Sequence, residues 1–567
     1  MSSRETSSRL LIPGSVFDQI CSGPVASSVV EILRKSQYGR RKVALRSLLD
    51  LMRKNSQQCG PFVDADYAWN VLASAERVAP AVVEEILMYP TVGVWSARAL
   101  LRISDCSPWS PEIGVLHAVA AAAAIRCEIP CIIRVPVVHN SVTLPTVGQF
   151  RLAQDSTGYA ELRTTSAGVE LVGQDTSFRP WKTHRSTAND NSLEVTFDDL
   201  DPYREFSEPT PPSPLSEVEY EKWARLLDEA WKLLAQWHEG YAVELSVGLT
   251  SLVPLSADRH VVAASSTLAF GSVALSDKGS ATELAEALVH ELQHSKLNAL
   301  IDLVELGGRG GGAHFYAPWR NDARPLEGLL HGIYAFTAVA EFWRAQRKLV
   351  PESRTRAADF TFAYRSCQVR RAVNSLRESA ELTEPGRYLV AAVSDRLAAC
   401  EAEAVPADLS EVITRIMTDH YATWRIRHVR PRAADAAELA DAWLAGRPPP
   451  RTACGEGEVL PCEDSGQSAR ATLLKMRVLE PERFEQVVRD RDADAAYARD
   501  DYPAAAAEYG RRIRSGSDSG QAWVGLGLAL RSASLLDRPE AVRAVYEEVS
   551  ARTGSRPDPA DLTSWMG

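Results

Sequence analysis

The spacing of apolar residues changes along the chain, and each change predicts a different kind of structure. Between residues 14 and 127, apolar residues recur at intervals of three and four and prolines separate the runs, which predicts amphipathic helices. From residue 128 to residue 198, apolar and polar residues alternate and Val, Ile and Thr are frequent, which predicts strands. Five prolines between residues 199 and 215 indicate an extended loop.

The second half of the chain returns to a helical pattern, with short strands before its central helix. Strands are predicted at residues 242–249 and at residues 264–274, followed by a long helix that Thr282 can cap. A second apolar helix contains His331, and residues 351–445 are again predicted to be helical.

The patterns together predict an α+β protein that is mostly helical and contains a small β-sheet. Residues 446–466 are rich in Pro and Gly and lack periodicity, so they are interpreted as a linker. The expected parts are a helical N-terminal region, a β-rich region with the Pro-rich loop, a central domain, the linker and a helical C-terminal domain: residues 1–127, 128–215, 216–445, 446–466 and 467–567.

The C-terminal domain is predicted to consist of Ala- and Arg-rich helices. Trp523, Leu526 and Gly527 match part of one tetratricopeptide repeat, and a plain helical bundle fits the pattern equally well. These helices are a candidate surface for a protein partner.

Composition narrows the class of protein. At 567 residues the chain is too long for one core, so two or three domains are expected. A net charge of -11 disfavours a nucleic-acid or anionic-membrane partner. The nine cysteines have no metal-site or disulfide spacing, and the first residues contain no long apolar run. A cytoplasmic protein with reduced thiols is therefore predicted.

Residues 290–294 form an HExxH pattern on the predicted central helix. His290 and His294 are four residues apart and leave the same helix face, which is the spacing that two nitrogens need to hold one divalent metal. Glu291 lies beside them and can reach a metal-bound water. The alternative is a pair of solvated histidines next to a charged glutamate.

A metal site needs a third protein ligand, and His331 is the best candidate. It lies within an apolar helical run, where a histidine has either a buried hydrogen-bond partner or a metal. The His pair upstream favours the metal. Leu297 and Leu300 occupy the positions of the Gly and His of the metzincin pattern, which excludes that class.

The order of strand, HExxH helix, loop and second helix looks like the zincin core, so residues 216–445 are predicted to be a metal-binding catalytic domain. In that arrangement an edge strand beside the metal helix holds an extended peptide by main-chain hydrogen bonds. The candidate strand here is residues 264–274. The pattern therefore favours a metalloenzyme that acts on a peptide.

The wider sequence resembles the HExxH-type peptide β-hydroxylases, also described as HExxH motif-containing peptide modification proteins. The resemblance covers residues 10–445 and is strongest at residues 282–344, in HELQHSKLNALIDLVEL, FYAPWRNDARPLEGLLHGIYAF and AEFWR. It implies hydroxylation of a β-carbon in a ribosomally synthesised precursor peptide, in peptide natural-product biosynthesis, with Fe(II) and 2-oxoglutarate.

The resemblance also implies roles for particular residues. The metal ligands would be His290, His294 and His331, with Glu291 as the catalytic residue. The far carboxylate of 2-oxoglutarate needs a cation, and the nearest candidates in sequence are Arg320 and Arg324. The alternative for each arginine is an ordinary surface salt bridge, for example with Asp322.

Other functions stay open at this point. Three neutral imidazoles suit zinc as well as iron, so one alternative is a zinc metallopeptidase with Glu291 as general base. Another is a non-catalytic scaffold that binds a peptide through the edge strand and the C-terminal helices. Dependence on 2-oxoglutarate distinguishes the hydroxylase from the peptidase and from the scaffold. The resemblance favours iron over zinc.

Overall fold

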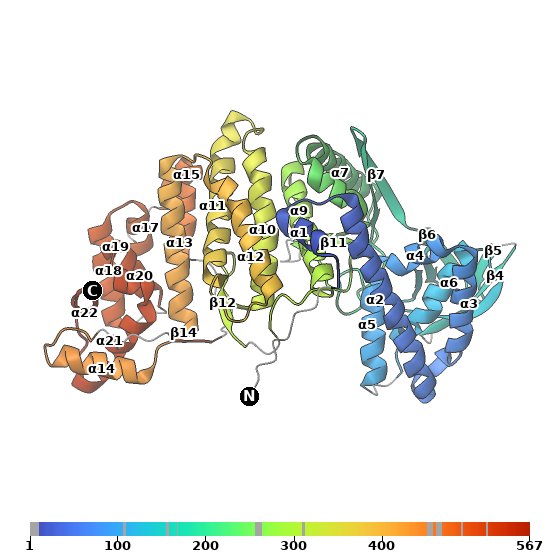
Figure 1. Cartoon of the computed structure of the whole chain (residues 1–567), viewed down its shortest axis with the longest axis horizontal. Coiled ribbons are helices and arrows are strands. Elements are labelled where there is room, and N and C mark those ends of the chain that lie inside the picture. The colour runs from blue at the N-terminus through green and yellow to red at the C-terminus, as the bar shows by residue number, and fades with distance from the viewer. Residues whose placement is uncertain are drawn as a thin grey trace. The chain divides into compact units, whose positions relative to one another are not determined.

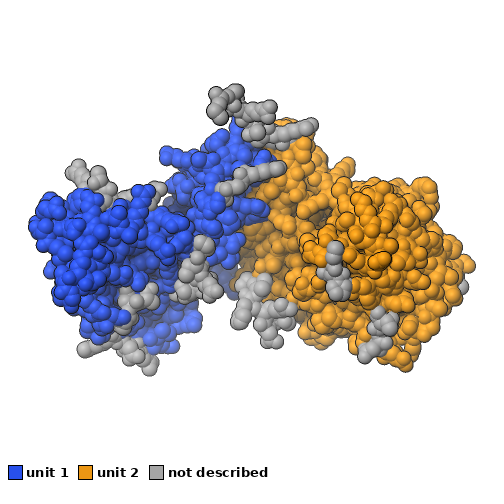
Figure 2. Space-filling view, turned by 90° about the horizontal axis from the view of Figure 1, so that it is seen from below, with its two compact units in different colours: residues 1–8, 305–567 blue, residues 9–304 orange. Residues whose placement is uncertain are grey.

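The computed structural model describes residues 11–105, 109–154, 158–166, 168–255, 263–308, 312–450, 457–460, 468–488, 492–516 and 520–567. The chain divides into two compact units, which Figure 2 colours separately. Arg9–Val304 form the N-terminal unit and Glu305–Gly567 form the C-terminal unit. The protein is α+β and mostly helical, as predicted (Figure 1). The division falls inside residues 216–445, and the five-part organisation stays a prediction.

Helices build the first part of the N-terminal unit, in agreement with the apolar periodicity of residues 14–127. They are α1 (Gly14–Ser22), α2 (Ser27–Lys54), α3 (Ala65–Val78), α4 (Pro80–Met88), α5 (Pro90–Ser104) and α6 (Val115–Arg126). The Ala-rich helix α6 is buried along Val115 to Ala124, and its small side chains let α3, α4 and α5 pack closely on it.

Two small antiparallel sheets follow, as the alternating pattern of residues 128–198 predicts. In one sheet the order is β1 (Cys131–Pro136), β4 (Tyr159–Thr165) and β5 (Gly168–Leu171). In the other it is β2 (Ser141–Leu144), β3 (Gly148–Leu152) and β6 (Thr176–Pro180). Their apolar faces share a core with the helices of this unit.

A five-stranded mixed sheet lies beside the motif helix. Its order is β10 (Ala263–Ala264), β11 (Ser272–Leu275), β9 (Ser251–Pro254), β8 (Asn191–Phe197) and β7 (Lys182–Ala188). Strands β11, β9 and β8 are parallel, and the outer strands β10 and β7 are antiparallel to their neighbours. Helices α7 (Glu217–Trp237), α8 (Glu239–Gly248) and α9 (Ala281–Ile301) pack with this sheet and with one another.

Two of the predicted strands are wrong. Residues 264–274 do not form one strand, because residues 265–271 leave the sheet through two turns, the second of which ends at Gly271 with a φ of 90°. Strand β11 then pairs antiparallel with β10. Residues 242–249 belong largely to helix α8, in which Tyr241, Ala242 and Leu245 are buried on one face. The Val-rich run fits both periods, and packing against the neighbouring helices decides in favour of the helix.

The C-terminal unit is almost entirely helical. A short hairpin of β12 (His314–Tyr316) and β13 (Ala323–Pro325) leads into the helices α10 (Leu326–Gln346), α11 (Glu352–Leu376), α12 (Glu384–Glu401), α13 (Ala407–His428) and α14 (Ala433–Leu444). After β15 (Glu458–Val459), which pairs with β14 (Val429–Arg430), the chain forms α15 (Ala469–Leu479), α16 (Pro481–Val487), α17 (Ala493–Ala498), α18 (Tyr502–Ser515), α19 (Gln521–Leu530), α20 (Ala533–Asp537), α21 (Pro539–Thr553) and α22 (Pro559–Met566).

One hydrophobic core connects the helices on both sides of residues 446–466, the segment interpreted as a linker. Leu409 and Ile413 of α13 belong to the same buried cluster as Leu474 and Trp523 of the later helices. A buried ion pair between Arg470 and Asp419, with an N–O distance of 2.8 Å, also crosses the segment. Residues 451–456 and 461–467 lie outside the described part of the chain.

Within the described residues, no single helix combines the length and the apolar character needed to cross a membrane. Helices α1 and α2 meet both requirements only as a pair, which is bent by 112°.

Candidate metal centre

The HExxH residues lie in the middle of α9, as predicted. The helix begins at Ala281, and the Ser280 hydroxyl accepts a hydrogen bond from the backbone N–H of Glu283 at 3.3 Å. Ser280 is therefore the N-cap, in place of the predicted Thr282. Leu284, Leu288, Leu292 and Leu297 are buried and fix the rotation of the helix about its axis.

His290 and His294 face one another across one turn of α9. Their Nε2 atoms are 3.0 Å apart, and the ring planes are nearly perpendicular, at 86°. With metal–nitrogen bonds of about 2.1 Å, this separation corresponds to an angle of about 90° at a shared ion. Ligand atoms of His290, Glu291 and His294 all lie within 4.8 Å of one another. The donor set therefore fits one divalent metal ion.

Glu291 is held in place from two sides. Its Oε2 accepts a hydrogen bond of 2.6 Å from the hydroxyl of Ser265, the residue that follows β10. Burial raises the pKa of the Glu291 carboxyl, and the hydrogen bond from Ser265 and the charge of Lys278 oppose this effect. Burial in turn lowers the pKa of the Lys278 ammonium. The carboxyl thus lies in a mostly dry environment with a hydroxyl and a cation next to it.

A buried polar cluster anchors α9 on its other side. Lys296 and Glu244 of α8 are fully buried and form an ion pair. Gln293 completes the cluster, because its Oε1 accepts from Lys296 Nζ at 3.2 Å and its Nε2 donates to Glu244 at 3.3 Å. The backbone N–H of Val25 also donates to Glu244, at 2.7 Å. Since Gln293 lies inside the HExxH motif, this cluster fixes the helix at the metal ligands.

His331 lies on α10, which belongs to the C-terminal unit. Burial, and then the charge of Arg324, lower the pKa of His331 to about 4, so its imidazole is neutral at neutral pH. A neutral imidazole is the form that binds a metal. The convergence of His331 with His290 and His294 stays a prediction.

Arg320 precedes β13 and Arg324 lies within it, in the same unit as His331. Both form ion pairs with Asp322, at 2.6 Å and 3.2 Å, which is the ordinary alternative considered for them. Arg324 packs over Gly328, and its Nε is buried without a hydrogen-bond partner among the described residues. Arg324 therefore has an unsatisfied donor, whereas Arg320 is half exposed.

Sequence reasoning did not identify Ser265, Lys278, Glu244 or Lys296. Lys296 has polar neighbours in Ser295 and Asn298, so the local sequence does not mark it as buried. The other residues reach the site from segments distant in sequence, and no local pattern marks them.

In comparisons with known proteins, no family model matched the chain and no curated protein sequence matched it.

Proposed function

We propose that the chain is a metal-dependent enzyme acting on a peptide, and specifically an Fe(II)- and 2-oxoglutarate-dependent hydroxylase of a β-carbon in a ribosomally synthesised precursor peptide. The observation that carries the proposal is the convergence of His290, Glu291 and His294 on α9, next to a sheet whose outer strand is β10. The choice of hydroxylation comes from the sequence resemblance.

The metal would be held by His290 and His294, with His331 as the third ligand. Three protein nitrogens leave coordination positions open for a substrate and for oxygen. Bound Fe(II) would supply the activation of oxygen that hydroxylation requires. Two features support this role: the imidazole of His331 is neutral, and the buried cluster of Gln293 and Lys296 fixes the helix that carries His290 and His294.

The peptide would bind along β10 in the manner of the zincin core. In the described part of the chain no other strand pairs with the outer edge of β10, so an extended peptide can add to it by main-chain hydrogen bonds. Ser265 ends this strand and donates to Glu291. A peptide on β10 would therefore run directly past the acidic group of the motif.

The co-substrate would be anchored by Arg324. Its buried Nε without a partner matches the need of a carboxylate for a directional donor, and Asp322 holds the guanidinium from the other side. Arg320 would contribute charge only, because it is more exposed.

A second candidate function is a zinc metallopeptidase, and the environment of Glu291 favours it. A buried carboxylate with a raised pKa beside two metal-binding histidines is suited to take a proton from a metal-bound water. The two functions differ in their need for oxygen and 2-oxoglutarate.

The metal and co-substrate are tested first without a peptide. Fe(II) and 2-oxoglutarate are added to the full chain without oxygen, and a visible metal-to-ligand charge-transfer band is expected. Arg324→Ala should remove the band and retain the metal, whereas Arg320→Ala should weaken it less. His331→Ala should lose most bound metal. His314→Ala is the matched control, since the side-chain hydrogen bond of His314 within the described residues is with the Gly312 carbonyl.

The reaction is tested with the precursor peptide. With Fe(II), 2-oxoglutarate and oxygen, the peptide is expected to gain the mass of one oxygen atom and to stay uncut. Peptide cleavage that proceeds with zinc, without oxygen and without 2-oxoglutarate, would replace the hydroxylase with the peptidase.

A further inference from the structure

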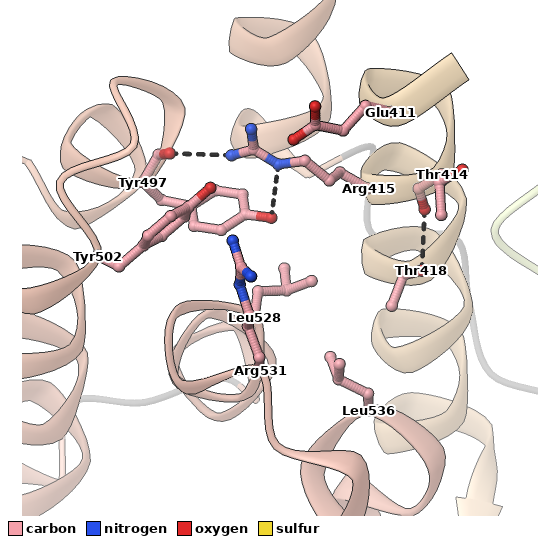
Figure 3. Close-up of a pocket in the computed structure, with 9 residues that line it drawn as sticks. All are labelled: Glu411, Thr414, Arg415, Thr418, Tyr497, Tyr502, Leu528, Arg531 and Leu536. Carbon is pink, nitrogen blue, oxygen red and sulfur yellow. Dashed lines mark hydrogen bonds between the residues drawn. The ribbon is translucent and has the colours of Figure 1, made fainter. Parts of the chain in front are cut away.

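A pocket of about 280 Å³ lies within the C-terminal unit, between α13 and the helices that follow residue 492. Figure 3 shows the residues that line it. Its polar lining includes Arg415, Thr414, Thr418 and Glu411 of α13 and Arg531 at the end of α19. Its apolar lining comes from Leu528, Leu536 and the rings of two tyrosines, Tyr497 and Tyr502. A pocket of this size suits one or two side chains of a peptide rather than a large cofactor.

Arg415 is fixed in the pocket and keeps unused donors. Its Nε donates to the Tyr497 hydroxyl at 3.1 Å, one Nη to the Tyr497 carbonyl at 3.1 Å and the other to Asp500 at 2.8 Å. The guanidinium also lies over the Tyr497 ring, 4.6 Å from its centre. These contacts use three of the five N–H groups of an arginine. Within the part of the chain that the structure describes, the remaining two have no acceptor, so they are available to a ligand at a preset position.

Arg531 is a cation without an ionic partner among the described residues. Its guanidinium lies 5.3 Å from the centre of the Tyr502 ring, and in the described residues it forms no ion pair or side-chain hydrogen bond. Figure 3 shows this group and that of Arg415 directed toward the same two tyrosine rings, one from the end of α19 and the other from α13. The guanidinium groups of Arg415 and Arg531 therefore both lie next to the same region of the pocket.

The backbone at Arg531 is a second, independent observation. Arg531 has φ 53° and ψ 38°, the left-handed conformation that usually selects glycine at the end of a helix. A side chain at this position costs stability, and such strain is found where the side chain serves a function. The site thus retains an arginine where the fold alone would favour glycine.

The charges and hydrogen-bonding groups define the ligand. The two arginines and Glu411 of the lining carry one net positive charge, and Asp500, the partner of Arg415, is itself also paired with Arg477. This balance fits a single carboxylate better than a doubly charged phosphate. The hydroxyls of Thr414 and Thr418 already donate to backbone carbonyls at 2.8 Å, so they can accept from an amide N–H. Leu528 and Leu536 offer an apolar surface beside them. A carboxylate, an amide and an apolar stem occur together in an acidic peptide.

We propose that this pocket is a binding site for an acidic peptide, in which Arg415 and Arg531 hold one carboxylate and the threonines and leucines hold the adjoining backbone and an apolar side chain. The site is separate from the candidate metal centre and needs no metal. The inference therefore does not rest on the proposed function.

Binding is measured by fluorescence anisotropy with the full chain and Gly-Leu-Glu-Leu-Gly peptides that carry an uncharged dye and an amidated C-terminus. A second peptide has Gln in place of Glu, a third has Gln and a free C-terminal carboxylate, and a fourth has phosphoserine in place of Glu. The carboxylate peptides are expected to bind more tightly than the neutral one. If the amidated Glu peptide binds more tightly than the Gln peptide with a free C-terminus, the bound carboxylate is that of a side chain. The opposite order identifies a terminal carboxylate.

Arg531→Gly is the decisive variant, because it removes the cation and relieves the backbone strain together. Its melting temperature should equal or exceed that of the wild type, while the carboxylate peptide binds about tenfold more weakly or worse. Arg531→Lys should restore part of the affinity. The matched control is Arg483→Ala, which removes an exposed arginine outside the pocket. The proposal would be overturned if neither carboxylate peptide binds more tightly than the amidated Gln peptide, if Arg531→Gly leaves binding unchanged, or if the phosphoserine peptide binds most tightly.

Discussion

Replacing Lys296 by methionine tests whether the buried cluster holds the motif helix in place. Lys296 and Glu244 are both fully buried, so the substitution leaves the Glu244 carboxylate without its counter-charge in a dry interior. Among the described residues, the Val25 N–H and the Gln293 amide remain as its donors. Removing one partner of a buried ion pair costs about 3–5 kcal/mol, and methionine restores little of this because it fills a similar volume without donating. We therefore expect Lys296→Met to lower the free energy of unfolding of the N-terminal unit by about 3–5 kcal/mol.

Substituting both partners of the ion pair separates the effect of the buried charge on stability from the effect of packing. In the double variant Lys296→Met with Glu244→Gln, the cluster is neutral and the glutamine still accepts the Val25 N–H. The double variant should then be more stable than Lys296→Met alone, with a coupling energy of about 2 kcal/mol or more. Replacement of a buried pair by neutral groups is often tolerated for the same reason.

Urea unfolding followed by circular dichroism gives the free energies, and hydrogen exchange over residues 281–301 locates the effect in α9. Lys222→Met is the matched control, since Lys222 forms an exposed ion pair with Asp277 in the same unit and such pairs contribute about 1 kcal/mol or less. A loss of under about 1 kcal/mol for Lys296→Met, or additive effects in the double variant, would refute the argument.

Further predictions concern the site, the pH dependence and the C-terminal helices. Ser265→Ala removes the hydrogen bond to Glu291 and should reduce turnover about tenfold or more. Bound metal, measured by elemental analysis, should be unchanged. Turnover equal to that of the wild type would show that Ser265 has no positioning role. Burial, and then the nearby charge of Asp201, raise the pKa of Asp198 to about 8, so its contribution to stability is present below about pH 4 and is lost as the pH rises to about 8. Asp198→Asn should flatten this fall in urea midpoints between about pH 4 and pH 8, and an unchanged slope would contradict the assignment. A chain ending at residue 446 should aggregate in size-exclusion chromatography because it exposes the shared core of the C-terminal unit, and a soluble monomer would show that residues 446–466 separate independent domains.

Local patterns were sufficient for most of the fold. The helices between residues 14 and 127 and the motif helix α9 follow from apolar spacing, because one face of each helix is buried. The apolar spacing predicted the wrong element at residues 242–249, because a Val-rich run fits a strand and a helix equally well. It predicted one strand at residues 264–274, where turns that end at Gly271 separate two short strands. Both errors come from tertiary contacts that local spacing does not contain.

The candidate site shows the same limit of local information. The pairing of His290 with His294 depends only on a four-residue interval, and the structure confirms that their nitrogens approach to 3.0 Å. The partners of Glu291 and Gln293 come from Ser265 and Glu244, which a loop and a separate helix bring to α9. For Arg320 and Arg324 the sequence left open a surface salt bridge, and the structure shows both paired with Asp322.

The arrangement around α9 explains why a metal site would be built at this position. One face of the helix packs through leucines, and the buried cluster of Lys296, Glu244 and Gln293 prevents the helix from sliding or rotating. The remaining face presents the His pair and Glu291 next to β10. Histidines that are held by a rigid element bind a metal without first losing conformational freedom, and a polar cluster fixes position more specifically than apolar contacts alone. The cluster thus links the packing of the N-terminal unit to the geometry of its candidate metal ligands.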